Sequence, residues 1–124
     1  MRPSSPMARW SIHRATAAAE TLAKKKIECE VIDLRTLSPI DMDTVLDSVE
    51  STGRLVCVDE ANPRCSIASD VAAKVAQDAF GSLKAGIQMV TAPHTPVPFS
   101  PVLEDLYIPT PAHIGAAVEK TMAQ

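Results

Sequence analysis

The chain has 124 residues, a formal net charge of −3 and a hydrophobic content of 46%, which fits one globular domain. It has no basic cluster with interleaved aromatic residues, so a nucleic-acid partner is not expected. No apolar run approaches the roughly 20 residues that span a bilayer, so we expect no membrane partner either. The three cysteines are an odd number without a Cys-X-X-Cys spacing, which favours a reduced, cytoplasmic protein.

The first part of the chain predicts a polar leader and then an amphipathic helix. Residues 1–6 (MRPSSP) are polar and proline-rich, so we expect a disordered leader, with residues 7–124 forming the domain. Residues 8–12 fit either a short strand or the lead into a helix. Residues 24–26 are all lysine and suit the last turn of that helix, where cations favour the dipole. The apolar stripe of the expected helix consists of Ile12, Ala15, Ala19, Leu22 and Ala23.

Residues 28–60 contain a strand, a helix and a second strand in about the smallest span that a parallel crossover allows. Residues 31–34 and 55–58 place apolar, β-favouring side chains on both faces, as strands covered by helices on both sides would. Between them, Asp41 is a good N-cap residue and Gly53 is suited to a left-handed C-cap. This pattern predicts one right-handed βαβ unit.

The second half continues the alternation of strands and helices. The Asn62–Pro63 step predicts a loop, and Ser66 is placed to cap a helix with a wide apolar face that ends at Gly81. Residues 87–92 form a further β-like run. The alternation predicts an α/β fold, with three α/β/α layers and a mostly parallel sheet of four to five strands.

The end of the chain is rich in proline. Residues 93–101 contain four prolines, so this segment cannot enter a central strand or a helix interior. We expect it to be extended and docked along the surface, with Val97 and Phe99 as anchors. A short helix is expected over residues 101–107. Thr110 then caps a last helix that has proline at its first position.

Polar side chains follow each expected strand, and open parallel sheets bind ligands beyond the carboxyl ends of their strands. Together with the two apolar residues of the proline-rich segment, these side chains form a candidate interface or ligand rim. The alternative is structural, because acidic groups at such positions also cap helices or pair with arginines. The candidate residues are Arg35, Asp59, Glu60, Asn62, Arg64, Thr91, His94, Val97 and Phe99.

The sequence predicts no catalytic, cofactor-binding or metal-binding residue. His13, His94 and His113 are far apart, and none is three or four residues from another metal ligand. Cys65 and His94 could in principle form a nucleophile and base, but their spacing does not indicate it. The chain also lacks a glycine-rich phosphate loop.

Three motifs carry a resemblance to a known family. They are VIDLRTLSPID (residues 31–41), GRLVCVDEANPRCSIASDVAAKV (residues 53–75) and VTAPHTPVPFSPVLED (residues 90–105). From about Ile12 to its end, the chain resembles the transketolase-like C-terminal domain of the β subunit of thiamine-diphosphate-dependent 2-oxo acid dehydrogenases (E1 components). The pyruvate, branched-chain 2-oxo acid and acetoin types share this domain, and the motifs are closest to the acetoin and branched-chain types.

The resemblance implies an assembly function. In the family, thiamine diphosphate lies between an α-subunit domain and an N-terminal β-subunit domain that carries the activating glutamate, and this chain contains neither. We therefore expect no activity and no bound cofactor for this domain alone, with thiamine diphosphate and Mg²⁺ belonging to the full complex. The implied partners are the E1 α subunit, a second β subunit and the E2 acyltransferase, with the proline-rich segment and the last helix as contact surfaces.

Two other functions remain open from the sequence. One is a free-standing regulatory module that binds a small anion or nucleotide at the carboxyl ends of the strands. The other is a small hydrolase that uses Cys65 and His94.

The resemblance breaks down at the N-terminus. In the family, an apolar strand lies centrally, between the strands expected at residues 31–34 and 55–58. Here only residues 6–10 are available for that place, and Arg9 is unsuited to a buried strand. We expect either truncated N-terminal strands or a rearranged sheet. Truncation would expose sheet edges and apolar surface, and so permit self-association.

Overall fold

The computed structural model describes residues 6–124, with side chains from Ile12 onward. Residues 1–5 of the expected leader lie outside the described residues, and the first helix begins at Pro6. The elements in chain order are α1 (Pro6–Ala23), α2 (Met42–Thr52), β1 (Val56–Val58), α3 (Ile67–Asp78), the 3₁₀ helix η1 (Phe80–Ser82), β2 (Gln88–Val90), α4 (Pro101–Tyr107) and α5 (Pro111–Met122).

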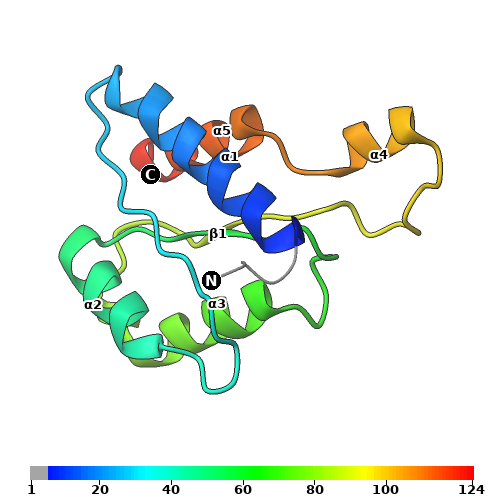
Figure 1. Ribbon diagram of the computed structural model, residues 1–124. Helices are drawn as coiled ribbons and strands as arrows, with labels where there is room; N and C mark the ends of the chain where they lie inside the picture. Colours follow the sequence, from blue (N-terminus) through cyan, green and yellow to red (C-terminus); the bar gives the residue numbers. More distant parts are fainter. Residues whose placement is uncertain (1–5) are drawn as a thin grey trace, which may run out of the picture.

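The elements form three layers, as the sequence predicts. Strands β1 and β2 pair in parallel, with Cys57 opposite Met89, and lie between two pairs of helices. Helices α1 and α5 cover one face of the strands, and α2 and α3 cover the other (Figure 1). The α/β class and the parallel sheet are confirmed.

Alternating side chains of β1 divide the core between the two helical layers, as the pleat of a strand requires. Cys57 packs with Val49 and Val75 in the cluster under α2 and α3. Val56 and Val58 point the other way and pack against Ala18 and Ile114 of α1 and α5. A strand that is apolar on both faces therefore fits this position between two apolar layers.

The caps at the starts of α2, α3 and α5 and at the end of α2 are where the sequence places them, whereas α3 ends at Asp78 and not at the expected Gly81. The Thr44 backbone N–H donates to Asp41 Oδ1 at 3.2 Å and the Thr44 hydroxyl donates to Asp41 Oδ2 at 2.6 Å. These two hydrogen bonds lower the pKa of Asp41, the hydroxyl contact having the larger effect. Gly53 ends α2 with a φ of 73°. Ser66 and Thr110 each form a capping box at the start of α3 and α5.

The expected number of strands is wrong. Within residues 6–124 the sheet contains two hydrogen-bonded strands, not four to five. Residues 28–34 run along the front of the domain in Figure 1 without joining a sheet, so the predicted βαβ unit lacks its first strand. A strand requires a partner at hydrogen-bonding distance, and a cleft separates this segment from β1.

Near the N-terminus the structure decides one open alternative and corrects one prediction. Residues 8–12 belong to α1, which is the second of the two alternatives, because a helix satisfies its own backbone without a neighbour. The helix ends at Ala23, so the lysines at 24–26 lie in the following turn rather than in its last turn. Lys26 takes a φ of 64°, which ends the helical path.

Candidate interaction surface

The parallel register of β1 and β2 brings two of the predicted rim segments together. The Asp59 backbone N–H donates to Val90 O at 3.0 Å, and the Ala92 N–H donates to Ala61 O at 3.2 Å. The loop after β1, with Asp59, Glu60 and Asn62, therefore lies beside the chain that follows β2, with Thr91 and His94. Because the two strands run in the same direction, their carboxyl ends lie at the same edge of the sheet.

Arg35 lies on a different element from the rest of the rim. It follows the unpaired segment 28–34, and its guanidinium Nε donates to Asp33 Oδ2 at 3.2 Å while 86% of its side chain is exposed. Asp59 Oδ1 accepts a hydrogen bond from the Ala61 N–H at 2.9 Å, so this carboxylate stabilises its own turn. This contact is neither the helix cap nor the arginine pair that the structural alternative names.

A hydrogen bond links the proline-rich segment to this rim. We define the arm as residues 93–107, which include α4 and extend away from both helical layers in Figure 1. The Tyr107 hydroxyl donates to Asn62 Oδ1 at 2.8 Å and lies 3.5 Å from Thr95 O. At the base of the arm, Arg14 Nη1 donates to Pro109 O at 2.7 Å. The sequence analysis did not identify Tyr107, because no local pattern links it to a loop 45 residues away.

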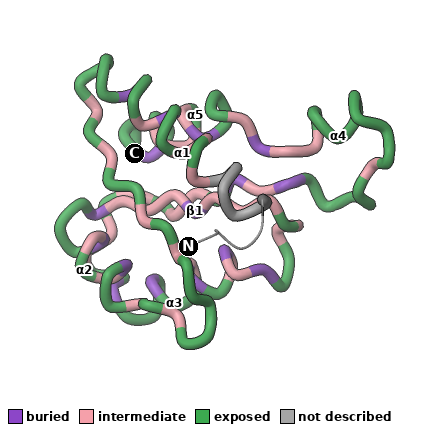
Figure 2. Tube along the Cα trace, viewed as in Figure 1, coloured by how far each residue is buried: buried purple, intermediate pink, exposed green. Residues whose placement is uncertain are grey.

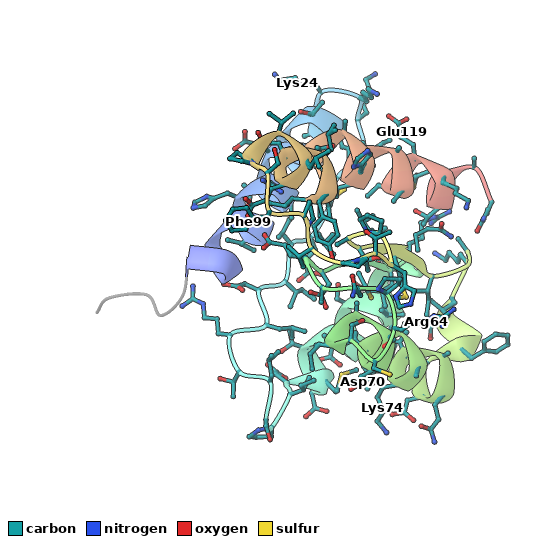
Figure 3. The ribbon with its side chains drawn as sticks, turned by 90° about the vertical axis from the view of Figure 1, so that its right-hand side faces the viewer. Lys24, Arg64, Asp70, Lys74, Phe99 and Glu119 are labelled. Atoms are coloured by element: carbon teal, nitrogen blue, oxygen red, sulfur yellow. The ribbon has the colours of Figure 1, made fainter. Side chains whose placement is uncertain are left out.

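Most of the arm, α4 included, has the colour of exposed residues in Figure 2, and the arm exposes large apolar side chains between Val97 and Leu106. Val97 is 70% exposed and Phe99 is fully exposed, so the prediction that they anchor the arm to its own domain is wrong. Tyr107 performs that function instead. Figure 3 shows Phe99 on the arm and Arg64 on the loop that leads into α3. The exposed apolar residues of the arm are Val97, Phe99, Val102, Leu103 and Leu106.

Such a run of apolar side chains is unusual on a free surface. Contiguous exposed apolar patches on proteins commonly mark contacts with other molecules. The arm also has restricted backbone freedom because of its prolines, and less entropy is lost when such a segment is immobilised. The arm is therefore suited to bind another protein surface.

The structure does not bring the candidate pair Cys65 and His94 together by a hydrogen bond among the described residues. Both side chains are exposed. Burial, and then the charge of Asp59, raise the pKa of the Cys57 thiol to about 11, which keeps it protonated and unreactive. Among residues 12–124, no three His, Cys, Asp or Glu side chains are grouped to hold a metal ion.

Comparison with known proteins identifies the domain. Residues 11–114 match the model of the family described as "Transketolase, C-terminal domain". The chain belongs to this family. A solved structure described as a split-gene transketolase, in an inactive β4 tetramer, superimposes on this transketolase C-terminal domain with a TM-score of 0.77 and 25% sequence identity. The superposition covers 91% of this chain and 35% of that chain.

Similar proteins to this transketolase C-terminal domain include β subunits of an acetoin oxidoreductase and of a pyruvate dehydrogenase. The β subunit of acetoin:2,6-dichlorophenolindophenol oxidoreductase from Cupriavidus necator is 72% identical over 111 residues, which are 90% of this chain and 33% of the relative. The pyruvate dehydrogenase E1 component β subunit of Bacillus subtilis is 40% identical over 111 residues, which are 90% of this chain and 34% of the relative. The domain thus spans about a third of the relatives' length.

Within residues 6–124, no helix is both long enough and apolar enough to cross a lipid bilayer.

Proposed function

We propose that this chain is the non-catalytic assembly domain of an E1 β subunit of a 2-oxo acid or acetoin dehydrogenase complex, formed by residues 7–124. In this proposal the domain works in the cytoplasm and contacts the E1 α subunit, a second β subunit and the E2 acyltransferase. The exposed apolar arm carries the proposal, because it offers a fixed contact surface that the domain itself does not cover.

The geometry of the arm supports a protein partner. Tyr107 and the loop at Asn62 fix the arm relative to the sheet, while Val97 and Phe99 point their side chains to solvent. Large apolar side chains on a fixed support are the residues that usually dominate the binding energy of an interface. Two acidic residues, Glu104 and Asp105, lie on α4 of the same arm and suit a partner with a basic rim.

We also propose that this domain alone does not bind the cofactor of the full complex. Thiamine diphosphate is held through a metal ion, and residues 12–124 offer no group of three metal-ligating side chains. We therefore assign no chemical step to this domain, and we infer that other parts of the complex hold thiamine diphosphate and Mg²⁺. The alternative anion or nucleotide site has less support, because Asp59 and Glu60 place carboxylates at the strand ends.

The proposal is tested by mixing the purified full chain with the E1 α subunit of an acetoin-type dehydrogenase and measuring association by analytical ultracentrifugation. Phe99→Ser is expected to weaken association by roughly tenfold, which is about 1.4 kcal/mol. Phe80→Ser is the matched control, because Phe80 is 74% exposed on η1, outside the arm. Equal losses for the two variants, or no association at all, would refute the role of the arm.

A second measurement tests the absence of catalysis. The chain alone, supplied with thiamine diphosphate, Mg²⁺ and acetoin or pyruvate, is expected to leave 2,6-dichlorophenolindophenol unreduced and to release no CO₂ from pyruvate. Any turnover above the protein-free rate would contradict the proposed function.

A further inference from the structure

The arm joins the core through a short segment between Tyr107 and α5. Pro109 is buried in this segment, and its carbonyl accepts a hydrogen bond from Arg14 Nη1 of α1 at 2.7 Å. Thr110 then caps α5. We define the joint as residues 108–113. These contacts fix the direction in which the arm leaves the core at its C-terminal end.

A histidine completes the cap of α5. The His113 backbone N–H donates to Thr110 Oγ1 at 3.3 Å, and the Thr110 backbone N–H donates in return to His113 Nδ1, also at 3.3 Å. Capping boxes usually have Glu or Gln at this second position. Those side chains keep an acceptor oxygen between about pH 5 and pH 8, whereas an imidazole can change its charge within this range. The capping box of α3 uses Ser66 and Ser69, which do not titrate.

We propose that His113 makes the joint sensitive to pH, because protonation of its ring releases the Thr110 backbone. The neutral ring accepts a hydrogen bond at Nδ1, but the protonated ring carries hydrogen on both nitrogens and has no acceptor. Nδ1 would then direct an N–H toward the N–H of Thr110. The positive end of the helix dipole also opposes a cation in the first turn of α5. Because His113 is exposed, its ring can turn to water, and the joint loses half of its capping box.

The charged groups around α5 do not favour a protonated ring in this place. α1, β1 and β2 pack against α5, and the two strands contain no charged side chain. The thiol of Cys57 lies on the other face of β1, under α2 and α3. On α1, Arg14 reaches this end of α5 and is itself a cation. Among residues 12–124, no salt bridge joins His113 to a carboxylate. The other titratable side chains that the structure describes on α1 and α5 are His13, Glu20, Glu119 and Lys120, and Glu119 pairs with Lys25 at the far end of α5.

This inference names a regulation of the arm, and its importance for assembly rests on the proposed function. In acid, a looser joint would let the arm sample more directions, so a partner would meet its binding conformation less often. The opening of the joint is a property of this chain alone. It can therefore be measured without a partner, and the two proposals can fail separately.

Amide hydrogen exchange of the full chain, resolved by residue with NMR at about pH 7.5 and about pH 5.5, tests the joint. After correction for the intrinsic rate at each pH, the Thr110 amide should exchange roughly threefold faster in acid, because half of a capping box is lost. The midpoint of this change should coincide with that of the His113 ring protons. The Ser69 amide, in the cap of α3, should keep its corrected rate.

Two variants separate the ring from other effects of acid. His113→Gln has the usual capping-box residue and retains His13 and His94, so the corrected rate of the Thr110 amide should be equal at the two pH values. In His113→Ala the rates should also be equal, but as fast as in the unsubstituted chain at about pH 5.5.

The inference is overturned by equal corrected rates of Thr110 at both pH values in the unsubstituted chain, or by a pH effect that persists in His113→Gln. Equal acceleration at the cap of α3 would also contradict it, because acid would then loosen the domain in general. Circular dichroism at both pH values establishes that each variant is folded.

Discussion

Tyr107→Phe tests whether one hydrogen bond sets the position of the arm. The substitution keeps the ring and removes only the hydroxyl that donates to Asn62 Oδ1 at 2.8 Å. Both residues are half-buried, so water can reach Asn62 in the variant and the penalty for an unpaired buried acceptor is reduced. We therefore expect a loss of about 1 kcal/mol, in the middle of the range for a neutral hydrogen bond.

This loss should appear as local opening of the arm. About 1 kcal/mol corresponds to a factor of about five in an opening equilibrium, so amides of α4 should exchange about five times faster. Amides of α3 should be unaffected, because α3 lies in the core and has no hydrogen bond with Tyr107. Amide hydrogen exchange followed by mass spectrometry measures both segments in one experiment.

A double-mutant cycle separates the hydrogen bond from other effects. Asn62→Ala should accelerate exchange in α4 by a similar factor, and adding Tyr107→Phe to it should have little further effect. The expected coupling between the two residues is about 1 kcal/mol. A coupling near zero, or equal acceleration of α3 and α4, would refute the reasoning.

Three further predictions concern the core, a helix cap and the thiols. Val75→Ala removes two fully buried methyl groups and should lower the free energy of unfolding by about 2–3 kcal/mol, which is roughly 10 °C in Tm. Val102→Ala, at an exposed position, should lower it by less than about 0.5 kcal/mol. Folding lowers the pKa of Asp41 from its usual 3.8, so the ionised carboxylate stabilises the fold above pH 3.8. This stabilisation is lost as the pH falls through the lowered pKa of the folded state. The urea midpoint of Asp41→Asn should therefore fall less steeply with decreasing pH than that of the unsubstituted chain. Iodoacetamide at about pH 8 should alkylate the exposed Cys65 in the native protein and spare Cys57 until guanidinium unfolds it, as peptide mass spectrometry can show. Equal losses for the two valine variants, parallel acid profiles, or equal labelling of the two thiols would contradict these predictions.

Local chemistry explains why the helix ends were predictable. Asp41, Ser66 and Thr110 each accept a hydrogen bond from a backbone N–H three residues ahead, and Gly53 takes the left-handed conformation that other residues avoid. These interactions are complete within a few residues of chain. The order of helices after residue 40 followed from such signals and from helical spacing of apolar residues.

The rim and the arm were predictable only in part. The sequence indicates that polar residues follow the strands, but only the parallel register shows that Asp59 and Thr91 lie on adjacent strand ends. The spacing of prolines indicates an extended arm, but it does not show which side chains hold it. The Tyr107–Asn62 contact joins residues far apart in the chain, so no local pattern contains it.

The sequence by itself determined the order of the helices after residue 40, the caps at their starts and the family, because these depend on neighbouring residues and on motifs that can be compared directly. Only the tertiary structure decided which extended segments become strands, because a ladder needs a partner at the right distance on each edge. Val31, Ile32 and Leu34 suit a strand covered on both faces, yet a cleft separates their segment from β1. For the same reason, whether Val97 and Phe99 pack inward or face solvent depended on the position of the whole arm.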